Sequence, residues 1–163
     1  YLLAELASPP GVWPVGHANL YRDGAFVGTG RIDFAAATSA NGTSSLAFGR
    51  DELVTVRAEP VQDLTGSAGF TGSRVERRTR RAYTVENRHK TPVTLQVLHA
   101  APVSRNEKIE VESSYQPQPT DLAWNRNPGT VAWQQPLAAG ATAQFSAAHT
   151  IRYPKDLDVQ ERQ

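Results

Sequence analysis

Apolar and polar residues alternate along most of this 163-residue chain, and no segment carries a sustained helical stripe. Successive side chains of a β-strand point to opposite faces, so this alternation predicts half-buried strands. The pattern is clearest over 93–99 and 143–153, where apolar side chains collect on one face. Shorter strands are expected over 1–7, 46–49, 53–56, 79–87, 108–112 and 130–137.

Turn-forming residues separate these strands. Asp23-Gly24 lies between two short apolar runs, which predicts a hairpin with a type I′ turn, because that turn needs a positive φ at both central residues. The segment 63–73 holds three glycines and has no periodicity. It is therefore predicted to be a mobile loop.

About nine or ten short strands, at spacings of roughly 8 to 12 residues, predict an all-β fold. We expect an antiparallel β-sandwich, immunoglobulin-like in general architecture. It is expected to form a single domain over 1–156, followed by a tail or linker over 157–163. The chain contains no methionine, so we take it to be a piece of a longer protein.

Composition removes several classes of function. The net charge is +1, whereas nucleic-acid-binding domains usually carry a marked basic excess, so nucleic acid is not an expected partner. The absence of cysteine excludes disulfides, zinc–thiolate sites and thiol catalysis. No stretch approaches the roughly 20 consecutive apolar residues that a spanning helix needs, so direct membrane insertion is not expected.

Motifs of catalysis and cofactor binding do not occur. The histidines His17, His89, His99 and His149 are not spaced as metal ligands, and the last two are expected half-buried on strands or at strand edges. No serine-nucleophile elbow, P-loop or complete dinucleotide fingerprint is found. The chain is therefore expected not to be an enzyme and to bind no cofactor or metal. A hydrolase whose carboxylates meet only on folding stays open as an alternative.

Four aromatic residues, Trp13, Tyr115, Trp124 and Trp133, could form a platform for stacking sugar rings. Trp133 lies in an alternating strand and is expected in the core. Trp13 and Trp124 flank loops rich in proline or asparagine and could be exposed. Buried packing with a hydrogen-bonded indole N–H is the favoured interpretation for these tryptophans.

Four short stretches occur in an order that resembles the C-terminal domain of the mucoidy-inhibitor (MuiA-like) family. They are Ala18–Gly28, Gly49–Asp51, Pro102–Ile109 and Tyr153–Asp156, and the resemblance covers nearly the whole of 1–156. It implies a β domain that follows an N-terminal β-rich domain and a coiled-coil middle, in a protein associated with suppression of mucoid growth. The family's domain usually begins upstream of Tyr1, and its C-terminal region has no assigned function, so the resemblance implies no catalytic residue.

The most unusual stretch, 73–89, holds five arginines within eight residues: Arg74, Arg77, Arg78, Arg80 and Arg81. Alternation places these charges on both faces of a strand, so this part cannot lie inside a sandwich core. It is expected to project beyond the sheet or to form an edge, where charge blocks edge-to-edge pairing. Partial pairing is expected with acids such as Glu107, Glu110 and Glu112.

An acidic partner is the alternative for these arginines, because planar guanidinium groups bind carboxylates through paired hydrogen bonds. We expect a non-catalytic interaction or assembly domain of a longer coiled-coil protein, in the periplasm or elsewhere in the cell envelope. Its partner would be a protein or the parent chain's other domains. The alternative is a binding module for acidic, uronate-bearing polysaccharide, with candidate residues Arg77, Arg78, Arg80, Arg81, Trp13 and Trp124.

Overall fold

The computed structural model describes residues 1–35, 43–68 and 73–157. Eleven strands occur within these residues, and every pair is antiparallel, which confirms the all-β prediction. The chain divides into two compact units, Tyr1–Leu53 and Val54–Gln163, and we describe each by itself. The single domain over 1–156 stays a prediction, and the expected tail lies almost wholly outside the described residues.

Unit 1 contains two strand pairs. Strand β1 (Leu3–Ala7) pairs with β4 (Thr43–Ala47), and β2 (Gly16–Arg22) pairs with β3 (Ala25–Ile32). The φ angles of Asp23 and Gly24 are 51° and 80°, which confirms the predicted hairpin and its positive-φ turn.

The buried centre of unit 1 is small. Leu20 on β2 and Leu46 on β4 are its only buried large apolar side chains among the described residues. Gly30 on β3 lets them approach the strand, because a Cβ at this position would lie 2.6 Å from Leu46 Cδ2. A side chain at residue 30 would therefore push the two leucines away from the sheet.

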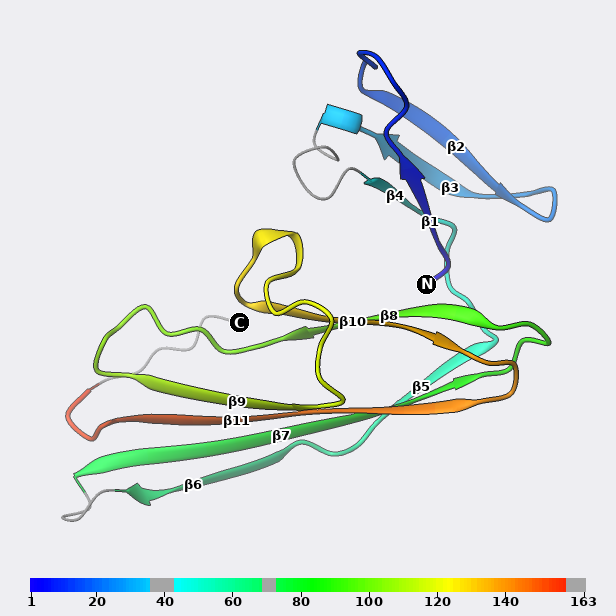
Figure 1. Cartoon of the computed structure of the whole chain (residues 1–163). Coiled ribbons are helices and arrows are strands. Elements are labelled where there is room, and N and C mark those ends of the chain that lie inside the picture. The colour runs from blue at the N-terminus through cyan, green and yellow to red at the C-terminus, as the bar shows by residue number, and fades with distance from the viewer. Residues whose placement is uncertain (36–42, 69–72, 158–163) are drawn as a thin grey trace. The chain divides into compact units, whose positions relative to one another are not determined.

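Unit 2 consists of two antiparallel sheets (Figure 1). The larger has the order β5–β7–β11–β9, and β6 also pairs with β7. The smaller pairs β8 with β10. The bounds are Val54–Ala58 for β5, Gln62–Ala68 for β6, Arg74–Asn87 for β7, Val93–Ala100 for β8, Glu110–Gln116 for β9, Thr130–Leu137 for β10 and Thr142–Pro154 for β11, with a short 3₁₀ turn, η1, at Trp124–Arg126.

The core of unit 2 lies between these two sheets, which confirms a sandwich for this unit. Val85, Phe145 and Ala147 from the larger sheet meet Leu95 and Trp133 from the smaller sheet. The apolar faces predicted from alternation over 93–99 and 143–153 are the faces that meet. Burial of these side chains is the main stabilising contribution to the unit.

The predicted mobile loop over 63–73 is wrong in its first half. Residues Gln62–Ala68 form β6, paired in continuous register with Arg74–Arg80 of β7. This strand lies on an edge of the sheet and is held by backbone pairing, so its sequence needs no apolar alternation. Residues 69–72 of that prediction lie outside the described residues.

Asn87 ties the end of β7 to two turns. Its side chain is fully buried, and its Nδ2 donates to the carbonyls of Thr91, Leu137 and Ala138 at 3.0–3.1 Å. Its Oδ1 accepts from the backbone N–H of His89 at 3.0 Å. One buried amide therefore has all its polar atoms satisfied and holds backbone groups of both turns.

We expect Asn87→Ala to lower the free energy of unfolding by about 2–4 kcal/mol, because it removes the hydrogen bonds by which this buried amide holds the two turns. Urea denaturation of the variant measures this loss. Gln144→Ala is the matched control, since Gln144 is an exposed amide on β11 of the same sheet, and a change within about 0.5 kcal/mol is expected there. Equal losses in the two variants would contradict the role of Asn87.

Candidate functional site

The arginine run lies in the interior of the larger sheet. Strand β7 pairs with β11 on one side, where Arg77 lies opposite Ile151 and Arg81 opposite Ala147. On its other side, β6 pairs with the same part of β7. The expected edge position of these arginines is therefore wrong, because the neighbouring strands are long enough to cover both edges of β7 outside the apolar core.

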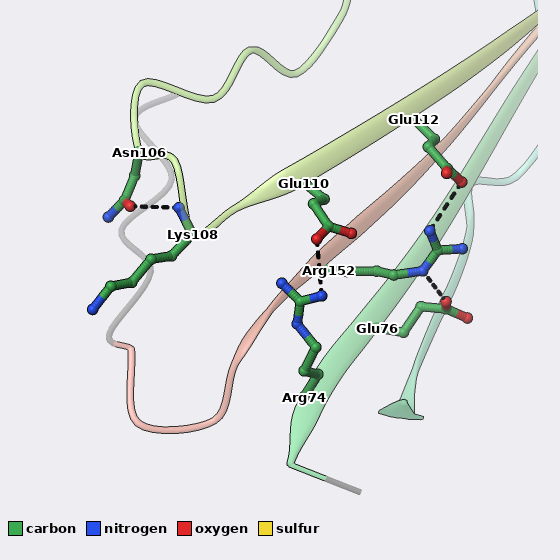
Figure 2. A network of polar contacts seen from close by, with 7 residues as sticks. All are labelled: Arg74, Glu76, Asn106, Lys108, Glu110, Glu112 and Arg152. Carbon is green, nitrogen blue, oxygen red and sulfur yellow. Dashed lines mark hydrogen bonds and ion pairs between the residues drawn. The ribbon is translucent and has the colours of Figure 1, made fainter. Parts of the chain in front are cut away.

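Carboxylates neutralise the outer face of this charged half of the sheet. Arg152 on β11 donates to Glu76 at 2.6 Å and pairs with Glu112 at 3.1 Å, as Figure 2 shows. In the same figure, Arg74 donates to Glu110 at 2.9 Å. The ion pairs join β7, β11 and β9 in one network. The predicted pairing with Glu110 is confirmed, whereas Glu112 pairs with an arginine outside the run.

The five arginines differ in their partners. Arg77 Nε donates to both carboxylate oxygens of Asp63, at 3.0 and 3.1 Å, and Arg78 pairs with Glu76 at 2.7 Å. Arg80 and Arg81 are exposed and form no ion pair with any carboxylate of the described residues. Of the four candidate arginines, these two alone keep guanidinium groups that are not already neutralised within the described part of the chain.

The network shifts the ionisation of its members. The hydrogen bond from Arg152, aided by the charges of Arg78 and Arg152, holds the pKa of Glu76 below its ordinary value. The hydrogen bond from Arg77 likewise lowers the pKa of Asp63. In return, the bonds to Glu76 and Glu112 raise the pKa of Arg152. These charges stabilise one another and are not arranged as an acid–base pair for catalysis.

Within unit 2, Tyr115, Trp124 and Trp133 do not form an exposed platform. Trp133 is 2% exposed, its indole N–H donates to Pro117 O at 2.8 Å, and Tyr115 packs edge-on against it. Trp124 is half-buried in η1 of unit 2. Trp13 belongs to unit 1 and is exposed, with Phe34 perpendicular to it at 6.4 Å. The predicted core position of Trp133 is confirmed.

A chain of four hydrogen-bonded side chains crosses unit 2, and sequence reasoning missed it. Tyr83 OH lies 3.2 Å from His99 Nδ1, His99 Nε2 lies 2.8 Å from His149 Nε2, and His149 Nδ1 lies 2.8 Å from Ser113 Oγ. The residues come from β7, β8, β11 and β9. Both histidines are buried, at 4% and 5% exposure, deeper than the sequence suggested. Each histidine alternates in step with the buried apolar residues of its strand, and this pattern in the sequence could have revealed that both rings point inward.

Burial lowers the pKa of both histidines. For His99 the loss of hydration acts first, followed by the charges of His149 and Arg81, and its pKa falls to about 4. For His149 the loss of hydration and the charge of Arg81 act in the same direction. Both rings are therefore neutral at pH 7.

Unit 1 carries an open hollow of about 470 Å³ beside its hairpin. Arg22, Asp23 and Val27 line one part, and Phe48, Gly49 and Arg50 line another. Arg22 donates to the carbonyl of Arg50 at 3.1 Å. The hollow therefore brings together parts of two motifs that carry the family resemblance, but it holds no carboxylate pair suited to hydrolysis.

The described residues contain neither a metal-binding cluster nor a membrane-spanning helix. Within 1–35, 43–68 and 73–157, no group of three or more histidine and acidic side chains is placed to hold a metal ion. In the same ranges no helix has both the length and the apolar character for a membrane span.

Comparison with known proteins identifies a family but no function. The model of a family described as "Domain of unknown function (DUF4139)" matches residues 13–155. No curated protein and no solved structure matches the chain significantly.

Arg152→Gln is expected to raise the pKa of Glu76 toward its ordinary value, because the largest cause of its depression is removed. A depressed carboxyl pKa stabilises the fold above the unfolded value of 4.5, and this contribution is lost as the pH falls through the folded value. The variant should therefore lose stability at neutral pH and show a weaker acid dependence below pH 4.5.

Carboxyl ¹³C NMR titration of Glu76 measures the change. Arg105→Gln is the matched control, because Arg105 is exposed and forms no ion pair with the described residues. An unchanged titration of Glu76 in Arg152→Gln would show that the contact does not hold the carboxylate.

Proposed function

The chain belongs to the DUF4139 family of unknown function, and from this premise we propose that it is a non-catalytic protein-interaction domain. The four motifs similar to the MuiA-like family support a parent protein with a coiled-coil middle, placed in the periplasm or elsewhere in the envelope. The partner in this proposal is a protein surface, which belongs to another protein or to another domain of the parent chain.

The observation that carries the proposal is the apolar surface of unit 1. Of the sixteen exposed large hydrophobic side chains in the described residues, ten belong to 1–53, a third of the chain. Only Leu20 and Leu46 are buried large apolar residues there. A unit of this size with so small a core needs apolar cover from outside itself, and exposed apolar surface on this scale is typical of protein contact sites.

Tyr21 and Phe26 form the best-defined part of this surface. They face each other across the β2–β3 hairpin, are each 58% exposed and meet edge to face at 5.6 Å. Exposed aromatic side chains fixed on a hairpin lose little entropy on binding and are frequent anchors of protein interfaces. Because the two rings are inclined at 66°, they do not offer the shared flat face on which a sugar would stack.

We expect the double variant Tyr21→Ser/Phe26→Ser to bind its protein partner at least about tenfold more weakly, because truncating anchor residues removes most of the contact energy. The native chain and its variants are used as baits in envelope extract. Calorimetry on the purified captured protein then gives the dissociation constants.

The matched control is Leu64→Ser/Leu98→Ser, which removes two exposed apolar side chains from unit 2. A protein bound equally by native and control chains, but weakly by the hairpin variant, supports the proposal. A protein bound equally by all three, or capture of glycan alone, would contradict it. Circular dichroism verifies that each variant is folded.

Binding of acidic polysaccharide is a second candidate, favoured by the exposed guanidinium groups of Arg80 and Arg81. Carboxylates of the chain already pair with the neighbouring Arg74, Arg77 and Arg78. An external acidic group would therefore bind to Arg80 or Arg81. The two side chains point to opposite faces of β7, which limits a single flat polymer to one of them at a time.

For this candidate, Arg80→Ser/Arg81→Ser should abolish retention of the chain on immobilised polyuronate, while Arg74→Ser/Arg78→Ser should leave it largely unchanged. Retention of the native chain should also fall steeply between 50 and about 200 mM salt, because exposed charges are screened. If both variants lose retention equally, the retention depends on net charge and not on Arg80 and Arg81, and polysaccharide binding at these residues is contradicted.

A further inference from the structure

The two buried histidines meet edge to edge. Their ring planes are inclined by only 6°, their centroids are 5.2 Å apart, and the Nε2 atoms are separated by 2.8 Å. Nitrogen atoms this close cannot belong to rings stacked face over face, because stacked rings are separated by a full van der Waals contact. The geometry is that of an N–H···N hydrogen bond between nearly coplanar imidazoles.

The same distance argues against a metal bound between the rings. Two imidazole nitrogens at about 2.0–2.1 Å from one zinc ion, in tetrahedral geometry, are more than about 3 Å apart. The observed 2.8 Å is too short for both nitrogens to ligate one ion. A proton is the species that fits between them.

The number of protons in this arrangement follows from the donors and acceptors. Two neutral rings carry two ring protons: one lies between the Nε2 atoms, and the other is bonded to one Nδ1. The remaining Nδ1 accepts from the hydroxyl of Tyr83 or Ser113, so every polar atom is satisfied. A third ring proton also fits, because each Nδ1–H can then donate to a hydroxyl oxygen. A fourth ring proton would place the two Nε2–H groups against each other.

The pair joins the two sheets of unit 2. His99 comes from β8 of the smaller sheet and His149 from β11 of the larger one. Arg81 and Tyr83 face the rings from β7, Ser113 and Tyr115 from β9, and Trp133 from β10. Within the described residues, no carboxylate forms an ion pair with either ring that would compensate an added positive charge.

We propose that His99 and His149 form a proton-sharing clamp between the two sheets of unit 2, which acid opens by placing a proton on both facing nitrogens. Closure needs at least one of the two Nε2 atoms to be free of its proton. Ser113, an exposed residue on β9, is the end of the hydrogen-bonded chain through which protons reach the buried rings.

The direction of the acid effect follows from the ionisation of the rings. A histidine with a depressed pKa stabilises the closed state above the unfolded value of 6.5, and this contribution is lost as the pH falls toward the folded value, about 4 for His99. Each unit of difference is a factor of ten in the closing equilibrium. From the depressed pKa of His99 alone, the ratio of closed to open molecules should therefore fall about 80-fold between pH 6.5 and 4.

NMR of the intact native chain with ¹⁵N-labelled histidine tests the shared proton directly. We expect a coupling across the hydrogen bond between the two Nε2 nuclei at pH 7. We also expect the coupling to disappear on acidification below about pH 4. Its absence at pH 7, or protonation of both rings already near pH 6.5, would overturn the proposal.

Hydrogen exchange tests the opening of the sheets. After correction for the intrinsic pH dependence, backbone amides of β8 and β10 should lose protection by the expected factor between pH 6.5 and 4, ahead of the strand pairs of unit 1. The variant His99→Gln/His149→Gln keeps a hydrogen-bonding amide at each position and cannot take up the protons, so its protection should stay constant down to about pH 5, above the range in which the carboxylates of unit 2 are protonated.

His17→Gln is the matched control, since it removes an exposed histidine of unit 1 and should leave the acid response unchanged. An identical acid response in His99→Gln/His149→Gln and in the native chain would overturn the clamp. If the double variant does not fold, the ¹⁵N coupling and titration of the native chain decide the question alone.

Discussion

The antiparallel pairing of β7 with β11 is the constraint on which the rest of unit 2 depends. The two strands are in register over thirteen residues, from Thr142 opposite Glu86 to Pro154 opposite Arg74. One end of this ladder supplies Val85 and Phe145 to the core, and the other carries the arginine run. Because the ladder is continuous, apolar packing at one end determines which face each charged residue occupies at the other. The backbone bonds of the ladder thus support a segment that hydrophobic burial alone would not hold.

This arrangement explains why so many arginines can lie on an interior strand. A strand between two neighbours places its side chains opposite those of both, and opposite charges across such positions attract each other. Arg77 finds its carboxylate in this way, on the neighbouring strand β6. Arg74 reaches Glu110 on β9, the strand beyond β11, and Arg78 pairs with Glu76 on the same face of β7. Pairs exposed to solvent contribute little to stability individually, but a network that spans three strands removes the repulsion that five clustered cations would otherwise cause. The run therefore consists mainly of internally neutralised charge, and only Arg80 and Arg81 remain for an external partner among the described residues.

Sequence patterns predicted the parts of the structure that depend on local chemistry. Asp23-Gly24 specified its hairpin, and the apolar parity around Phe145 specified the buried face of β11. The patterns failed where distant segments decide the outcome. Strand β6 has no apolar alternation, because its partner β7 holds it through the backbone, and so it resembled a loop. Each buried histidine looked ordinary in its own strand, since the 2.8 Å contact joins residues fifty positions apart.

The position of the histidine pair has a structural reason. Trp133 of the core packs against His99, whereas the charge of Arg81 acts on both rings and the exposed Ser113 is bonded to His149. The pair thus lies where the apolar core ends. Burial keeps both rings neutral, and the bond to the exposed Ser113 lets them exchange protons with solvent. A buried polar contact of this kind is stable only if both rings are aligned, so it also selects one placement of β8 over β11 from those that apolar packing would tolerate. The same bond that favours this placement at neutral pH makes the junction of the two sheets the acid-sensitive part of the unit.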